Sequence, residues 1–129
     1  MSETILTMQL LKEFYGVCRL DKAESIPEWA QRGNFFSVTR TSEELSIVCE
    51  EVNIPNEIKC EKAWRILKVL GPLDFSLIGI LSKISTVLAY KAISIFAIST
   101  YDTDYILVKN KDINKAVEAL KEKGYEIRL

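Results

Sequence analysis

The sequence contains no histidine, and this absence removes several kinds of chemistry. Imidazole is the usual general base beside a serine or cysteine nucleophile and a common ligand of zinc. Ser-His-Asp triads, imidazole acid–base catalysis and zinc catalysis are therefore excluded. We expect no cofactor and no metal.

Cysteine is scarce as well: the three residues Cys18, Cys49 and Cys60 are odd in number and form no C-x-x-C pair. This usage is typical of reduced, mostly buried thiols rather than a disulfide framework or a metal site. A nucleophilic cysteine would lack its usual base. We expect ordinary, unactivated thiols.

Long apolar runs are also missing. The longest, residues 93–98, contains a serine and is far shorter than the ~20 residues that span a bilayer. The N-terminus has no basic region followed by an apolar core, so we predict no signal peptide. The expectation is a cytoplasmic protein with no membrane partner.

Neither sign of charge dominates, since 17 Lys and Arg stand against 18 Asp and Glu. The basic residues are scattered, whereas nucleic-acid binding normally requires a basic stripe, so we expect no nucleic-acid partner. With 48% hydrophobic and 27% charged residues, the chain has the composition of a globular protein. Its 129 residues suffice for one ordinary domain or two very small ones sharing a core.

The chain matches itself at a shift of 60 residues. The shift places Phe36 on Phe96, Val38 on Ile98 and Glu44 on Asp104. In each copy, two apolar runs flank a short polar segment, "RTSEE" or "TYDTD", which indicates a β-hairpin. We therefore predict two similar units, residues 1–61 and 62–129, whose Phe36, Val38, Phe96 and Ile98 share one core.

The second unit has the clearer pattern. A strand at 63–70 precedes a helix at 75–91, capped by Asp74 or Ser76, in which Gly79 would allow close approach to the sheet. The nearly continuous apolar run at 92–100 predicts a central strand, and 105–110 is its hairpin partner. Asp112 caps a last helix that ends at Gly124, and 125–129 form an edge strand. The order is β-α-β-β-α-β, the ferredoxin-like arrangement.

The first unit is predicted to be degenerate. Residues 4–20 hold one or two strands broken near Tyr15, residues 26–32 make only a short helix, and residues 53–62 have room for about one helical turn. The predicted fold class is α+β.

Three phrases, "FFSVTRTSEELSIVCEE", "WRILKVLGPLDFSLIGILSKIS" and "ISIFAISTYDTDYILVK", resemble the small tandem ACT-domain proteins related to the cytosolic arginine sensors and to aspartate kinases. The resemblance implies two ACT-type units side by side, with one continuous antiparallel sheet and helices on one face. It also implies that an effector, commonly an amino acid, binds between units against the turn after the first strand, here "GPLDFS".

A free amino acid needs N–H donors for its carboxylate and an acidic group for its ammonium. The candidate ligand-binding residues lie in the turn and in the second hairpin: Asp74, Phe75, Ser76, Leu77, Ile78, Thr100, Tyr101, Asp102, Thr103 and Asp104. Helix capping would alone explain Asp74, and turn geometry would alone explain Asp102 and Asp104.

The leading functional hypothesis is a non-catalytic regulatory or sensor module that binds a small amino acid. Many amino-acid-binding ACT domains have a glycine in the middle of the turn, where this chain has Pro72–Asp74. That difference favours an alternative, a dimerisation module that has lost its ligand. An enzyme of acylphosphatase type is a third hypothesis, disfavoured because the turn places an acid where a phosphate would sit.

Overall fold

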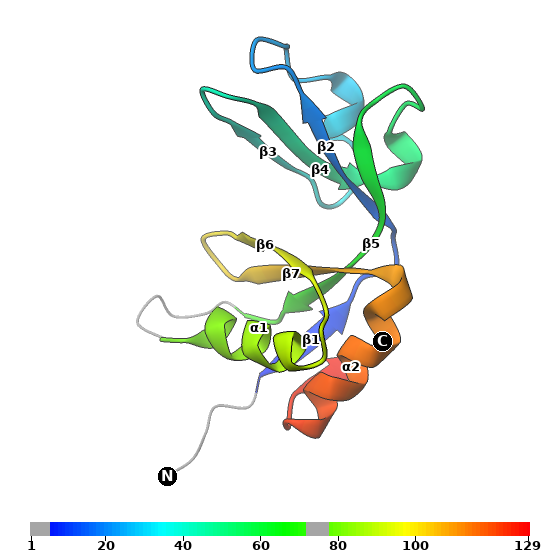
Figure 1. Ribbon diagram of the computed structural model, residues 1–129. Helices are drawn as coiled ribbons and strands as arrows, with labels where there is room; N and C mark the ends of the chain where they lie inside the picture. The colour runs from blue at the N-terminus through cyan, green and yellow to red at the C-terminus, as the bar shows by residue number, and fades with distance from the viewer. Residues whose placement is uncertain (1–5, 72–77) are drawn as a thin grey trace. The chain divides into compact units, whose positions relative to one another are not determined.

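Strand β5 (Cys60–Val69) belongs to both compact units of the chain. One unit, Glu13–Trp64, is called the inserted unit; the other, called the helical unit, comprises the residues up to Lys12 together with Arg65–Leu129. The computed structural model describes residues 6–71 and 78–129 (Figure 1). Strand pairing links all strands into one sheet through β5.

The helical unit has the element order predicted from the sequence. After β5 come α1 (Ile80–Tyr90), β6 (Ile95–Ser99), β7 (Asp104–Lys109), the 3-10 turn η3 (Asn110–Asp112), α2 (Ile113–Glu122) and β8 (Glu126–Arg128). The predicted βαββαβ order is confirmed for this part of the chain.

The N-terminal strand β1 (Thr7–Leu10) lies in the helical unit, between β5 and β8. The sequence placed it with the first unit. Met8 pairs with Val69 of β5 in antiparallel fashion and with Ile127 of β8 in parallel fashion, so an entirely antiparallel sheet was also wrong. The buried Met8 side chain explains the placement, because it joins the core of this unit.

Both helices pack against the same face of this part of the sheet (Figure 1). That face carries Met8, Leu67, Val69, Ile106 and Val108. The helices contribute the buried residues Ile84, Leu88, Ile113, Ala116, Val117 and Leu120. Burial of these apolar side chains is the main force that holds the helices on the sheet.

Left-handed residues mark the helix ends. Gly79, at φ 78°, precedes α1, which begins at Ile80 rather than at Phe75. Within residues 6–71 and 78–129, a Cβ at Gly79 would meet no atom within 4 Å, so the predicted close approach to the sheet was wrong. Ala92 (φ 58°) and Gly124 (φ 94°) follow the two helices and form the same C-terminal motif. Asp112 precedes α2, but its side chain makes no capping hydrogen bond.

Strand β6 pairs only with β7 among the strands that the structure describes. The predicted central position was therefore wrong. Ile95 packs against the core, and Phe96 and Ile98 are half-buried on the opposite face. A continuous apolar run indicates burial on both faces of a strand, which does not require a neighbour on each edge.

The inserted unit repeats the same order with 3-10 turns in place of helices. Its elements are β2 (Tyr15–Leu20), η1 (Glu28–Gln31), β3 (Ser37–Arg40), β4 (Leu45–Glu50), η2 (Glu51–Asn53) and the first half of β5. Strand pairing follows β3-β4-β2-β5. The predicted short helix at 26–32 is confirmed by η1, whereas the helical turn predicted within 53–62 lies at Glu51–Asn53, before most of that range.

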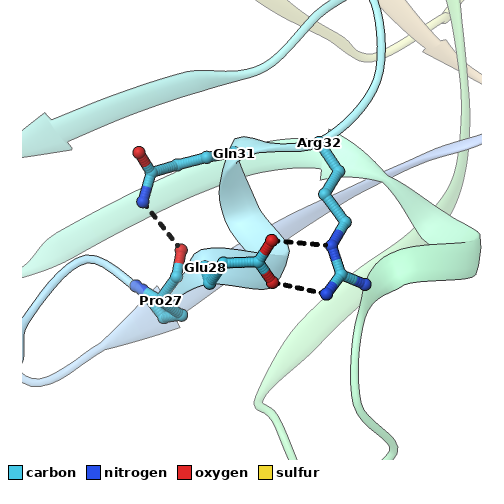
Figure 2. Close-up of polar contacts among 4 residues, drawn as sticks. All are labelled: Pro27, Glu28, Gln31 and Arg32. Atoms are coloured by element: carbon cyan, nitrogen blue, oxygen red, sulfur yellow. Dashed lines mark hydrogen bonds and ion pairs between the residues drawn. The ribbon is translucent and has the colours of Figure 1, made fainter.

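Turn η1 is held by its own side chains and by a small buried contact. The Arg32 guanidinium donates to both carboxylate oxygens of Glu28, and the Gln31 amide donates to the Pro27 carbonyl at 3.3 Å (Figure 2). Ala30 is fully buried in the cluster of this unit, with Cys18, Leu45, Ile47, Cys49 and Ile54.

The two hairpins repeat with a shift of 59 residues, one fewer than the sequence suggested. The Thr41 N–H donates to the Glu44 carbonyl in the first hairpin, and Thr100 and Thr103 make the same bond in the second. A one-residue change moves every strand residue to the other face of the sheet. The predicted shared core of Phe36, Val38, Phe96 and Ile98 was wrong. Phe36 is 43% exposed, and Val38 packs against the buried cluster of the inserted unit, which contains neither Phe96 nor Ile98.

Within residues 6–71 and 78–129, no helix is both long enough and apolar enough to cross a membrane.

Candidate functional site

The second hairpin loop is fixed to the end of β5 by a buried hydrogen bond. Thr103 is only 5% exposed, and its hydroxyl donates to the Val69 carbonyl at 2.6 Å. Val69 is the last residue of β5, and Gly71 begins the turn singled out in the sequence. The hairpin therefore lies beside the start of that turn.

Two of the predicted ligand-binding residues shape the loop itself. The Thr100 N–H and hydroxyl both donate to the Thr103 carbonyl, at 2.8 and 3.0 Å. The Thr103 N–H returns a bond to Thr100 Oγ1 at 3.3 Å. Both threonine hydroxyls are thus committed to the protein, which leaves the side chains between them to face outward.

Those two side chains, Tyr101 and Asp102, are exposed, with Tyr101 81% accessible. They extend from a loop that the two threonines hold in one conformation. An ionised carboxylate in such a place can pair with an ammonium or guanidinium group.

Asp104 is half-buried and interacts across the hairpin. Its Oδ1 accepts a hydrogen bond from the Ser99 hydroxyl, its cross-strand partner. The register places this pair on the same face as Ile95 and Ile106, the face that the helices cover. Sequence reasoning missed Ser99, because only the hairpin register brings it to the carboxylate.

The start of α1 supplies N–H donors, at different residues from those predicted. The first intrahelical bond joins the Lys83 N–H to the Gly79 carbonyl at 2.9 Å, so the N–H groups of Ile80, Leu81 and Ser82 precede it. Among the described side chains, none makes a capping bond there, and the first turn of α1 has no acidic residue. An anion is stabilised by such a helix start.

The rest of the predicted turn is only partly placed. Ile78 precedes α1 and is 89% exposed. Asp74, Phe75, Ser76 and Leu77 lie outside the described residues. The described part of the candidate site therefore consists of the hairpin Ser99–Asp104, the end of β5 and the beginning of α1.

Two other features of the described chain bear on the choice of site. A groove of about 590 Å³ lies between the C-terminal halves of α1 and α2, lined by Thr86, Val87, Tyr90, Lys91, Ala119, Glu122 and Lys123. It contains none of the predicted ligand-binding residues. Among the described side chains, no three His, Cys, Asp or Glu residues are placed to hold a metal ion.

Two family models match the chain. The ACT-domain model matches residues 59–122, and a model of an N-terminal domain matches residues 13–57. The second match begins where the inserted unit begins.

Among curated proteins, the chain is 30% identical over 100 residues to the cytosolic arginine sensor for mTORC1 subunit 1 of Bos taurus. The match covers 69% of this chain but only 30% of the bovine protein. A human relative, the putative protein CASTOR3P, is 34% identical over 95 residues, which cover 64% of this chain and 58% of the relative. The chain thus spans less than two thirds of each of these relatives.

Solved structures cover the chain more completely. A crystal structure of an Agobacterium tumefaciens protein has a TM-score of 0.91 and 36% identity, covering 97% of this chain and 93% of that one. The regulatory subunit of aspartate kinase from Thermus thermophilus, in a ligand-free form, has a TM-score of 0.62 over 92% of this chain and 97% of that one. At 11% identity, this second likeness shows the fold alone. The chain is therefore a member of the ACT-domain family, related to the cytosolic arginine sensors, with its ACT domain at residues 59–122.

Proposed function

We propose that this chain is a non-catalytic regulatory or sensor module whose helical unit binds a small amino acid. The observation that carries the proposal is the Thr103–Val69 hydrogen bond, which joins the acidic hairpin to the strand that leads toward α1. The bond places the acidic hairpin beside the end of β5, and α1 is the next helix along the chain.

The chemistry of an amino acid matches these groups. Its ammonium, or a cationic side chain, would pair with Asp102 or Asp104, while its carboxylate would accept from the N–H groups of Ile80, Leu81 and Ser82. Charge-assisted hydrogen bonds at both ends would give specificity for a zwitterion without a catalytic group.

The relatives support a regulatory role. The bovine relative, 30% identical to this chain over 100 residues, is an arginine sensor. Because this chain spans 30% of the bovine protein, arginine is one ligand to test rather than the ligand we assign.

Isothermal titration of the folded chain against the standard amino acids tests the proposal, and Asp104→Asn tests the site. Loss of one charge-assisted hydrogen bond should weaken binding of the ligand by about 1.5–3 kcal/mol, or roughly 10- to 150-fold in Kd.

Glu43→Gln provides a matched control. Glu43 occupies in the first hairpin the position that Asp102 has in the second, and the substitution removes the same charge. It should leave binding unchanged. Equal Kd values for Asp104→Asn, Asp102→Asn and the parent would remove the hairpin from the site.

A second candidate function is an assembly module without a ligand. Among the described strands, β3, β6 and β8 each pair with one neighbour only, and an open strand edge can pair with another chain. Light scattering separates the two functions, because an assembly module should form the same homodimer with and without amino acids.

A further inference from the structure

Three strands of the inserted unit bring all three cysteines of the chain together. Gly16 and Cys18 lie two residues apart on β2 and therefore on one face of the sheet. Gly16 is the cross-strand partner of Cys49 on β4, and Cys18 is the partner of Cys60 on β5. Partners share a face, so the three side chains converge.

Gly16 provides the space in which they meet. A Cβ at this position would lie 2.7 Å from Cys60 Sγ and 2.4 Å from the Ile54 side chain. The Cys60 sulfur therefore packs over the Gly16 backbone, beside the strand that carries Cys49. All three cysteines are free thiols in the structure.

The ladder favours one pair over the others. The Arg19 N–H donates to the Lys59 carbonyl at 3.1 Å, so Arg19 and Lys59 form a hydrogen-bonded pair and Cys18 and Cys60 form the adjacent non-hydrogen-bonded pair. Such pairs have Cα atoms about 4.5 Å apart, inside the range of about 4.4–6.8 Å that a disulfide requires. Cys18 and Cys49 are diagonal neighbours, which lie farther apart.

We propose that Cys18 and Cys60 form a reversible disulfide, making this pair an oxidation site of the inserted unit with Cys49 left as a free thiol. Cys60 is half-buried, whereas Cys18 and Cys49 are 2% and 0% exposed, so Cys60 meets the oxidant first.

The reaction with a low-molecular-weight disulfide, such as oxidised glutathione, balances as follows. The Cys60 thiolate attacks one glutathione sulfur, forming a mixed disulfide and releasing one glutathione thiolate. The Cys18 thiolate then attacks the Cys60 sulfur and releases the second glutathione. Two protein thiols are oxidised, one glutathione disulfide is reduced, and the two thiol protons end on the two glutathione molecules.

Burial raises the pKa of the Cys60 thiol, and hydrogen bonding to Cys49 raises the pKa of Cys18. The thiolate fractions of Cys18 and Cys60 at neutral pH are therefore small, and the disulfide should form slowly. Interaction with Cys18 lowers the pKa of the Cys49 thiol instead, so the expectation of unactivated thiols holds for Cys60 and not for Cys49.

Peptide mapping of the full folded chain tests this pairing. After incubation with oxidised glutathione, denaturation and alkylation, trypsin separates the cysteines onto residues 13–19, 41–59 and 60–62. We expect the first and third peptides linked, with a mass lower by two hydrogens, only the Cys49 peptide alkylated, and full reversal by dithiothreitol.

Two variants and one outcome complete the test. Cys49→Ser should still form the link, whereas Cys60→Ser should leave both remaining cysteines open to alkylation. A link that involves Cys49, or alkylation of all three cysteines in the wild-type chain after prolonged oxidation, would overturn the proposal. The wild-type map decides even if a variant fails to fold.

Discussion

Thr103→Val is the substitution that most directly tests how the hairpin is held at the candidate site. Valine keeps the shape of threonine but has no hydroxyl, so the change removes the bond to the Val69 carbonyl while leaving the packing in place. The Leu70 N–H donates to the Thr7 carbonyl, which makes Met8 and Val69 a non-hydrogen-bonded pair of β1 and β5. The Val69 carbonyl therefore points away from β1, toward the neighbour on the other edge.

The expected cost follows from this geometry. β7 is the neighbour on that edge and begins only at Asp104, so the Thr103 hydroxyl stands where the next ladder bond would be. An unsatisfied buried carbonyl costs about 1–3 kcal/mol, and we expect the free energy of unfolding to fall by that amount.

Thr86→Val is a matched control, because the Thr86 hydroxyl also donates to a carbonyl, that of Ser82, at 2.8 Å. Thr86 is exposed, so water can replace its bond, and valine has a similar helix propensity. This variant should change stability by less than about 0.5 kcal/mol.

Urea unfolding followed by far-UV circular dichroism is the appropriate assay, since both α-helices belong to the helical unit. Trp29 and Trp64 both lie in the inserted unit, so their fluorescence reports on that unit instead. Equal losses of stability in Thr103→Val and Thr86→Val would refute the idea that Thr103 anchors the hairpin.

Other substitutions test the turns and the tight packing. Ala92→Gly removes the strain of a left-handed alanine after α1 and should stabilise the chain by about 0.5–1 kcal/mol. Gly124→Ala introduces the same strain after α2 and should destabilise the chain by about 1 kcal/mol. Urea unfolding measures both changes, and a destabilising Ala92→Gly or a stabilising Gly124→Ala would contradict the shared C-terminal motif. Gly16→Ala must displace Ile54 and Cys60 and should lower stability by about 1–3 kcal/mol, seen as a lower melting point by tryptophan fluorescence. An unchanged melting point would show that this site has free space.

The elements that the sequence predicted well depend on local patterns. Both α-helices lie within the predicted ranges because apolar residues recur at helical spacing, Ile84 and Leu88 in α1 and Ile113, Val117 and Leu120 in α2, and these residues are buried. The hairpins and the 3-10 turns of the inserted unit also follow from short runs and turn residues.

The missed features depend on pairing between distant residues or on backbone conformation. The pattern of Met8 and Leu10 indicates a strand but not that it pairs with both β5 and β8. The apolar periodicity of the sequence extends N-terminally beyond Gly79. The left-handed conformation of Gly79 sets the start of α1 at Ile80.

The candidate site shows the same division. Composition identified the acidic hairpin. Only the strand register shows that Asp104 accepts a hydrogen bond from the Ser99 hydroxyl and that Thr100 and Thr103 form hydrogen bonds within the loop. The sequence likewise does not show that the three cysteines lie close together, because their proximity depends on the registers of β2 with both β4 and β5.

Calorimetric titration of the folded chain with each standard amino acid tests the central claim most directly. The proposal predicts saturable binding of at least one amino acid, weakened roughly 10- to 150-fold by Asp104→Asn and unchanged in Glu43→Gln. Absence of binding heat for every amino acid, with equilibrium dialysis also showing no retention, would contradict the account and leave the assembly module as the function to pursue.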